Sequence, residues 1–540
     1  MEKPSSGTVS PASDNLDASQ KPKPNPVFKG STVPPARFWI LTVGICLGLF
    51  LSLIDTSIVA TSIYTIGVEF KDVRRVNWVA LAYTLAYLGC AVTFTRVSDV
   101  IGRRNAFVAS YLLFLAFSLG CGVAQTLDQL IVFRTLQGIG GSGLYSVSMI
   151  LLTEVCPDHL TQHIGSVIGL VIAASGALGP VLGGILTHLA SWRWIFWING
   201  PVGIVSLAII FIAWPKPEQM PSSTRRSWKE FDYVGSVLII PAAVLVVFAF
   251  QNAGESPDTT TIWSQASFIA PLTIGLALWL VLIAWGYLAG HFFKDRVALT
   301  FPITLFRNRA YLAAAISTLF LGFPYFILSY SFPLRAQVVA EKSSLIAGVM
   351  LLPMVGSSAL GTFLTGFISR TKNYLFETML TGVCLMTLGT GLLTMVHSAK
   401  DNSKALGFIF LVGLGFGFTV ASATMLTSLE VPMKDYSPAQ GIIAQFRILG
   451  GSLGISTSTV LLSKKASLVL SLRGQPLSAE QRDVVHQAYS EAFHSDMTVA
   501  VAAAATAILI VLVAYRRGRM LVKDQKEAQI REEIERRLRQ

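Results

Sequence analysis

The chain consists largely of apolar blocks, each roughly 18 to 25 residues long, with short polar stretches between them. A helix of about 20 apolar residues crosses the hydrocarbon core of a bilayer, where only helices and closed barrels satisfy their backbone hydrogen bonds. The blocks lack the alternating pattern of a barrel strand. Because 52% of the residues are hydrophobic and only 13% are charged, the sequence predicts an all-α membrane protein.

We expect 14 transmembrane helices that form two six-helix bundles with an inserted helix pair between them. The expected helices cover residues 38–66, 77–95, 105–124, 129–153, 164–187, 193–214, 234–250, 266–290, 310–334, 345–368, 376–397, 405–430, 439–462 and 497–515. Glycine-rich helices and basic loops recur at corresponding positions of the first six and the last six. Repeated bundles around a midplane site are common in secondary transporters.

The expected domains follow from this count. They are a disordered cytoplasmic N-terminal tail (1–37), an N-terminal six-helix bundle (38–214), a cytoplasmic loop with inserted helices 7–8 and a connecting loop (215–309), a C-terminal six-helix bundle (310–515) and a charged cytoplasmic C-terminal tail (516–540). The first tail is rich in Ser, Pro and Lys and holds no apolar block, which predicts disorder and gives no sign of a cleavable signal peptide. The polar outer loop at 463–496 has room for a short helix.

The Lys and Arg residues set the expected orientation. Of 42 in the chain, 28 fall in the tails and in the loops on the same side as the tails, and 11 fall in the opposite loops. Positive charge gathers on the cytoplasmic side, so both termini are predicted to be cytoplasmic. This distribution also explains the net charge of +12 without nucleic acid. The five cysteines predict no disulfide framework.

Asp55 is the most informative residue because it is an acid inside the first apolar block. A lone carboxylate there costs about 2.5–3.5 kcal/mol, so a partner or a water-filled cavity must compensate. Arg134, with Gln137 one turn further along the fourth helix, lies at a similar depth and can pair with Asp55. We interpret Asp55 as an acid that carries a proton or senses substrate. The alternatives are a purely structural acid and a static salt bridge.

The loop after the second helix combines Asp99, Gly102, Arg103 and Arg104. The glycine permits a tight turn, while the charged side chains can bond to helix ends or carboxylates of the other half and so latch one conformation. The alternative is a turn that only follows the positive-inside pattern.

Two further features point to movement. The fifth helix carries Gly176, Gly179, Pro180, Gly183 and Gly184, a cluster that predicts a bent and closely packed pivot. The alternative is ordinary small-residue packing. Arg447, in the thirteenth helix, is a candidate charge of the second half, and its alternative is an arginine that snorkels to the inner rim.

Together these segments resemble the major facilitator superfamily, in particular the 14-span drug:proton antiporters of the fungal branch that exports toxins and other secondary metabolites. The resemblance covers residues 38–515. In the family, the loop after the second helix carries the motif G-x-x-x-D-x-x-G-R-R. In this chain Thr95 stands in place of the leading glycine, and Val100 stands in place of a usual basic residue. The matching residues are Asp55, Thr56, Asp99, Gly102, Arg103, Arg104, Arg134, Gln137, Gly138, Gly140, Gly179, Pro180, Gly183 and Gly184.

The resemblance implies a monomeric transporter that exports small apolar or amphipathic molecules as protons enter, with Asp55 binding the proton and Arg134 modulating its proton affinity. It implies a plasma-membrane location, with a vacuolar or other internal membrane as the alternative. A proton-coupled importer or a uniporter of a nutrient such as a sugar or siderophore is the alternative function, and a membrane-embedded sensor is a third. The sequence holds no Walker loop, metal-ligand spacing or nucleophile elbow, so we expect no enzyme activity and no cofactor.

Overall fold

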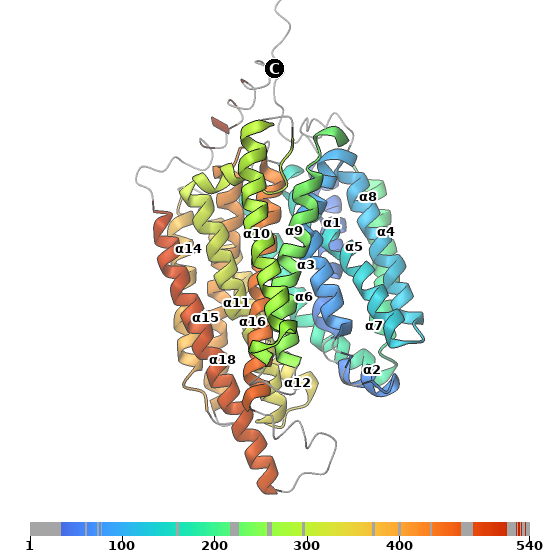
Figure 1. The fold of residues 1–540 in the computed structure, drawn as a ribbon, viewed down its shortest axis with the longest axis vertical. Helices are drawn as coiled ribbons and strands as arrows, with labels where there is room; N and C mark the ends of the chain where they lie inside the picture. Colours follow the sequence, from blue (N-terminus) through green and yellow to red (C-terminus); the bar gives the residue numbers. More distant parts are fainter. Residues whose placement is uncertain are drawn as a thin grey trace, which may run out of the picture.

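The computed structural model is a bundle of long, roughly parallel helices (Figure 1). It describes residues 34–59, 62–72, 75–76, 78–157, 161–215, 226–255, 262–293, 297–369, 373–397, 401–432, 435–465 and 479–515, with residues 525, 528, 529, 531 and 535 of the C-terminal tail. Most of both predicted tails lies outside these residues. In the described part, β pairing is limited to one isolated bridge between Phe231 and Ala298.

The helices of the first half and of the connecting region come first in the chain. They are α1 (Pro35–Ile58), α2 (Ile63–Glu69), α3 (Trp78–Ile101), α4 (Arg103–Val123), α5 (Leu127–Glu154), α6 (Thr161–Leu189), α7 (Trp194–Trp197), α8 (Asn199–Ala213), η4 (Trp228–Glu230), α9 (Tyr233–Glu255), η5 (Ile262–Ser264), α10 (Ala266–Phe292) and η7 (Ile303–Arg307). The second half follows. It contains α11 (Arg309–Val338), α12 (Ser344–Val349), α13 (Leu352–Ile368), α14 (Leu375–Leu393), α15 (Asn402–Glu430), α16 (Tyr436–Lys465) and α18 (Ala479–Val513).

Twelve helical segments among the described residues are long and apolar enough to cross a membrane. Two more long helices, α5 and α16, are not among these twelve. Both are rich in glycine and polar residues, and they bury side chains such as Arg134 and Gln445 against neighbouring helices. A helix in the middle of a bundle needs little apolar surface toward lipid. The all-helical membrane fold is therefore confirmed, while the count of 14 spans stays a prediction.

Four predicted helices differ from the observed ones. The spans 193–214 and 345–368 are each two helices, α7 with α8 and α12 with α13. The first predicted span, 38–66, is two helices: α1 ends at Ile58, and the short α2 follows from Ile63. The last predicted span, 497–515, belongs to a helix of 35 residues that begins at Ala479 and extends beyond the rest of the bundle in Figure 1. Its first turns are polar, so hydropathy alone assigns them to a loop.

The two halves repeat the same packing scheme. In the first half α1 packs on α6 and α8, and α5 packs on α3 and α4. In the second half α11 packs on α16 and α18, and α15 packs on α13 and α14. The halves meet where α3 contacts α16 and where α6 contacts α13. Glycines permit both contacts: a Cβ at Gly441 would lie 2.9 Å from Thr95, and one at Gly169 would lie 2.2 Å from Thr362.

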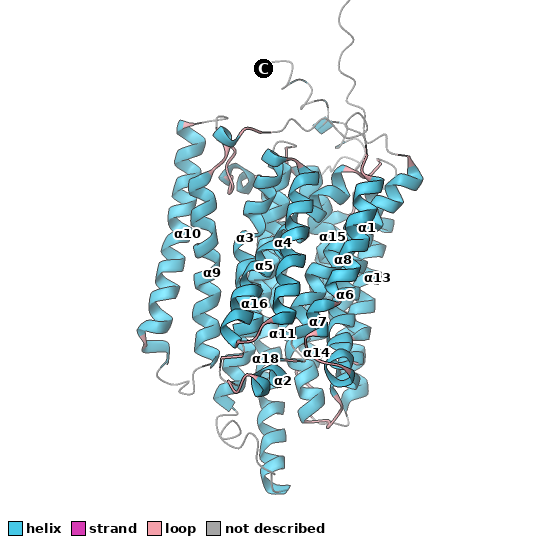
Figure 2. Ribbon diagram, turned by 90° about the vertical axis from the view of Figure 1, so that its right-hand side faces the viewer, coloured by secondary structure: helices cyan, strands magenta, loops and turns pink. Residues whose placement is uncertain are grey.

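The helices α9 and α10 form a hairpin along one side of the bundle (Figure 2). α9 packs on both α3 and α16, where the two halves meet, and α10 packs mainly on α9. Asp232, just before α9, anchors the hairpin by accepting hydrogen bonds from the Trp285 Nε1 of α10 and the Thr300 backbone N–H, both at 2.9 Å. The outer face of α10 exposes large apolar side chains, among them Leu280 and Phe292, as lipid contact requires.

Candidate functional site

Asp55 and Arg134 form a buried ion pair inside the N-terminal half. Asp55 is 0% and Arg134 is 1% exposed, and Arg134 Nη1 contacts Asp55 Oδ2 directly. Gln137 Nε2 donates to Asp55 Oδ1 at 3.1 Å, and Asn199 Nδ2 donates to the same oxygen at 3.3 Å. Residues from α5 and α8 thus surround the carboxylate of α1 with three donors.

The remaining surface of the Arg134 guanidinium is also occupied. Its Nε donates to the Val79 carbonyl at 3.0 Å, and Nη1 donates to Gln137 Oε1 at 2.9 Å. The rings of Tyr83 and Phe196 lie 4.2 and 5.5 Å from its central carbon. A charge pair that is this well bonded repays much of the desolvation of its members, whereas removal of one charge leaves the other buried and unpaired. Loss of the Asp55 charge would therefore disturb the whole cluster.

Sequence reasoning missed Asn199, the fourth member of this cluster. Its amide donates to Ser118 Oγ at 2.9 Å as well as to Asp55, and Ser118 in turn donates to the Phe196 carbonyl at 2.9 Å. An asparagine inside the apolar stretch WIFWINGPVG is a signal that could have identified it, because a buried amide needs hydrogen-bond partners.

A series of polar and aromatic contacts connects this cluster to the other half. Tyr83, beneath Arg134, donates to the Ser52 carbonyl at 2.9 Å, and Ser52 Oγ lies 3.4 Å from the Tyr87 hydroxyl. The rings of Tyr87 and Tyr145 lie 5.7 Å apart. Arg447 of α16 then donates to the Tyr145 hydroxyl at 3.3 Å. Arg447 is only 5% exposed, so it faces the contact between the halves and does not snorkel.

The loop between α3 and α4 joins the two halves at the opposite end from α2. Gly102 has a φ of 90°, a conformation that favours glycine, and it starts α4. Asp99 and Arg103 pair at 2.6 Å, and both bond to Ser437 of α16: Ser437 Oγ donates to Asp99 at 2.9 Å, and Arg103 donates to Ser437 Oγ at 2.7 Å. Asp99, Arg103 and Ser437 are called the latch below.

Neighbouring charges support the latch. Arg103 also pairs with Glu154 at 2.9 Å. Arg96, which is 1% exposed, pairs with Asp99 at 3.2 Å and with Asp435 at 3.7 Å, and it donates to the Leu299 carbonyl. Glu154, Asp435 and Ser437 were missed from the sequence because they lie in segments far from Asp99 in the chain. Arg96 was also missed, although it is only three residues before Asp99.

The contacts of Arg104 with other described residues lie within its own half. Its guanidinium lies over the rings of Phe211 and Trp214, 5.2 and 5.9 Å from their centroids, and both rings belong to the N-terminal half. The expectation that Arg104 bonds across the halves therefore has no counterpart among these contacts.

The glycines of α6 differ in their surroundings. A Cβ at Gly179 would lie 1.9 Å from Ser57 Oγ, so this glycine lets α6 approach α1. Gly183 is buried. A Cβ at Gly176 or at Gly184 would meet no atom within 4 Å, so helix packing does not require a glycine at either. The helix continues through Pro180, whose side chain lies outside the described residues. The pivot stays a prediction.

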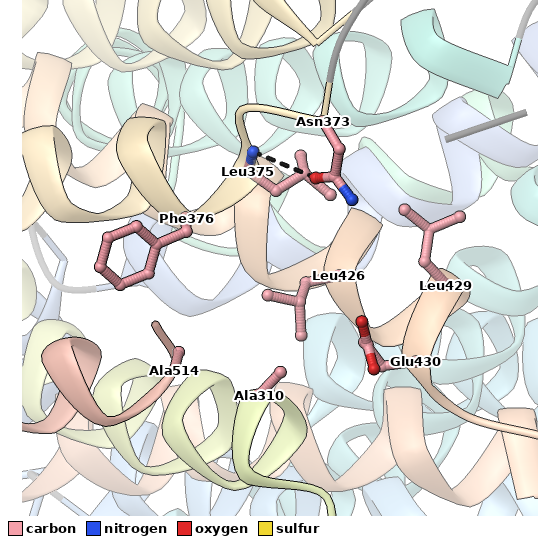
Figure 3. Close-up of a pocket in the computed structure, with 8 residues that line it drawn as sticks. All are labelled: Ala310, Asn373, Leu375, Phe376, Leu426, Leu429, Glu430 and Ala514. Carbon is pink, nitrogen blue, oxygen red and sulfur yellow. Dashed lines mark hydrogen bonds between the residues drawn. The ribbon is translucent and has the colours of Figure 1, made fainter. Parts of the chain in front are cut away.

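The pocket in Figure 3 lies away from Asp55. It is at the latch end of the C-terminal half, between α11, α14, α15 and the end of α18, and Glu430 is its one charged lining residue. Glu430 already accepts hydrogen bonds from Asn308 at 2.9 Å and from Gln525 of the tail at 3.0 Å. This pocket lies at one end of the C-terminal half.

The described part of the chain holds no group of three or more His, Cys, Asp or Glu residues that could bind a metal ion. All five cysteines are free thiols. The site therefore offers buried charge, hydrogen bonds and contacts between two similar bundles, which together define a membrane transport protein.

Comparison with known proteins names the family. Residues 45–455 match the Major Facilitator Superfamily, and the chain belongs to this family of transporters, which are not enzymes. The "MFS-type transporter FPY5" of Fusarium mangiferae is 31% identical over 439 residues, covering 79% of this chain and 72% of that protein. The "Efflux pump FUS6" of Gibberella fujikuroi is 31% identical over 443 residues, covering 81% and 76% of the two chains. Both relatives are fungal members of the superfamily.

Similarity also extends to a bacterial protein and to a solved structure. "Multidrug resistance protein 3" of Bacillus subtilis is 28% identical over 432 residues, covering 79% of this chain and 80% of that protein. The crystal structure of a bacterial homologue of the human lysosomal transporter Spinster superposes with a TM-score of 0.53 at 13% identity, covering 89% of this chain and 97% of that one. At this identity the structural match shows the fold alone.

Proposed function

We propose that the protein is a proton-coupled exporter of small apolar or amphipathic organic molecules that works by alternating access. The observation that carries the proposal is the buried, fully bonded pair of Asp55 and Arg134. An ionisable acid inside a membrane bundle is a functional feature by default, and this one has a partner whose charge would be left unpaired by protonation. In this proposal the chain spans the membrane 14 times, as bundles 38–214 and 310–515 with α9 and α10 between them.

Protonation would act in three steps. A proton on Asp55 removes its negative charge, so Arg134 of α5 loses the counter-ion that holds it against α1. Arg134 then moves relative to Tyr83, the first residue of the contacts that lead through Tyr87 and Tyr145 to Arg447. A shift of α16 would in turn separate Ser437 from Asp99 and Arg103, which opens the latch. Each step uses a contact between described side chains.

The direction and the cargo rest on two kinds of support. In the antiporter family that the chain resembles, the Gly-Pro-x-x-Gly-Gly sequence found in α6 is associated with exporters. Several relatives also carry efflux in their names, among them the "Aspyridones efflux protein" of Neocamarosporium betae. We further propose that the protein is a monomer of the plasma membrane with both termini in the cytoplasm, because Lys and Arg predominate in the tails and in the loops on their side.

Transport by inside-out membrane vesicles tests the proposal. With an acidic lumen, vesicles that contain the protein should accumulate members of a panel of amphipathic dyes, and a protonophore should abolish the accumulation. Asp55→Asn should abolish it too. Asp128→Asn is the matched control because Asp128 lies in the same half with 71% of its side chain exposed. Accumulation that resists the protonophore, or that stays at full rate in Asp55→Asn, would overturn proton coupling.

A further inference from the structure

A second acid is buried in the C-terminal half. Asp496 lies 18 residues into α18 and is 2% exposed. It lies on the inward face of the helix with Ala492 and Ala500, which are 3% and 0% exposed. Sequence analysis placed it at the end of a loop, because the polar start of α18 hides the continuity of the helix.

Asp496 and Asp55 lie at similar depths. Counting from the latch end, Asp55 is 17 residues beyond Phe38 and Asp496 is 19 residues before Tyr515, which correspond to roughly 25 and 28 Å at about 1.5 Å per residue. The two acids lie on helices that are not counterparts in packing, because α1 packs on α6 and α8 as α11 packs on α16 and α18, so α18 corresponds to α8. By residue count, the acids of the two halves thus lie at similar depths.

Hydroxyl groups surround Asp496. Ser458 Oγ of α16 donates to Asp496 Oδ2 at 2.5 Å, and the Ser331 side chain of α11 faces the same carboxyl group. Among the described residues, neither Asp496 Oδ1 nor Ser331 Oγ has a hydrogen-bond partner of good geometry. A proton on Oδ1 would supply the missing donor, with the Ser331 oxygen as its acceptor.

No cation pairs with Asp496 among the described residues, and the charged groups nearby have other contacts. On α11, Arg335 donates to Asn402 at 3.0 Å and lies over the Phe493 ring. On α16, Arg447 bonds to Tyr145. On α18 itself, His494 Nδ1 lies 2.9 Å from the Thr394 carbonyl. Beyond α14, the His397 ring lies beside His494, and Glu377 is in the first turn of α14, at its other end.

We propose that Asp496 is a second proton-binding site, protonated in this conformation and able to release its proton to water when α18 moves against α11 and α16. An ionised carboxylate in an apolar bundle without a cation or several donors is strongly disfavoured, whereas a neutral carboxyl group fits the two serines. The role in transport rests on the proposed function, but the protonation of Asp496 does not.

Infrared spectroscopy of the full chain in lipid nanodiscs tests the protonation directly. At about pH 7 the wild type should show the carbonyl stretch of a protonated carboxyl group, and Asp496→Asn should lack it. Ser458→Ala should keep this band but shift its frequency, because the hydrogen bond to Oδ2 is lost. Asp483→Asn, an exposed acid on the same helix, should leave the band unchanged. Absence of the band in the wild type, or its persistence in Asp496→Asn, would overturn the proposal.

Dye accumulation by inside-out vesicles then tests the role in transport. Asp496→Asn should lose accumulation driven by the pH gradient while it still lets dye equilibrate downhill. Accumulation at the wild-type rate would mean that the buried acid is structural only, and this overturns the coupling role. If the infrared band behaves as expected while Asp55→Asn transports at full rate, the proposed function fails and the second proton site stands.

Discussion

The two halves of the molecule bury one acid each at similar depth, but they compensate it in opposite ways. Asp55 contacts an arginine and accepts from two amides. Within the part of the chain that the structure describes, Asp496 has one serine donor and an oxygen without a hydrogen-bond partner. Because an ion pair stabilises the charged form and an apolar site stabilises the neutral form, the same residue type is expected to be ionised in one half and protonated in the other. Depth alone therefore does not determine what a buried acid does.

The strongest way to break this comparison is to remove the cation from the N-terminal half. Arg134→Gln leaves Asp55 without a cation, with only the amides of Gln137 and Asn199 as donors, and loss of one member of a buried pair costs about 3–5 kcal/mol. We expect a marked drop in thermal stability, measured by size-exclusion chromatography after heating, and recovery of much of it in the double variant Asp55→Asn/Arg134→Gln. Equal stability of Arg134→Gln and the wild type would show that the pair is not the main compensation.

Removal of one amide sharpens the comparison. Asn199→Ala deletes a donor to a charged carboxylate, and such bonds contribute about 1.5–3 kcal/mol. The same thermal assay should show a smaller loss than for Arg134→Gln. Asn252→Ala, where the amide bonds only to an exposed carbonyl, is the control and should have little effect.

A substitution in the latch tests whether contacts between the two halves stabilise the latched conformation. Ser437→Ala removes the hydroxyl that bonds to both Asp99 and Arg103, and we expect about 1.5 kcal/mol less stability for the latched conformation, which is roughly a tenfold shift in the population. Distances between spin labels on the two halves at this end should become longer. Ser495→Ala, whose hydroxyl bonds within α18, should leave the distances unchanged.

Removal of a hydroxyl bonded to Asp496 should reduce the stability of the protein less than removal of an amide bonded to Asp55. If Asp496 is neutral, Ser458→Ala removes a bond between uncharged groups, and the loss should be about 1 kcal/mol. Unfolding measurements on Ser458→Ala and Asn199→Ala under identical conditions check this ranking. A larger loss for Ser458→Ala would indicate an ionised Asp496.

The smallest effect on stability is expected outside the membrane, where α2 meets the start of α7. Burial raises the pKa of Glu69, but hydrogen bonds from Trp192 and Arg193 and the charge of Arg193 outweigh it, so its pKa lies below the ordinary 4.5. A lowered pKa gives stability that is present above the unfolded-state value and is lost as the pH falls through the folded-state value, here below about 4.5. Glu69→Gln should remove this acid-side dependence and cost at most about 1 kcal/mol, as for other surface pairs. An unchanged dependence on pH in that variant would exclude Glu69 as its source.

The sequence predicted the features that follow from one segment at a time, namely the helices and the need of each buried charge for a partner. The apolar blocks predicted the helices, and the acid at Asp55 with the arginine at Arg134 predicted a partner for each, because an isolated membrane charge is expensive. Ser437 and Asp435 could not be predicted as members of the cluster around Asp99, since their contacts depend on how the end of α3 meets the start of α16. The pairing of Arg96 with Asp99, by contrast, follows from their i,i+3 spacing on one helix. Asp496 was missed for a different reason: the helix that buries it begins with polar turns, and hydropathy does not register them as part of a span.

The direct test of the account is a pH titration of the distance across the latch, with spin labels on the α3–α4 and α15–α16 loops of a cysteine-free chain. Acidification should lengthen this distance in the wild type, and Asp55→Asn, which mimics the protonated acid, should show the long distance at every pH. If Asp55→Asn instead follows the wild-type titration, protonation of Asp55 does not open this end of the protein.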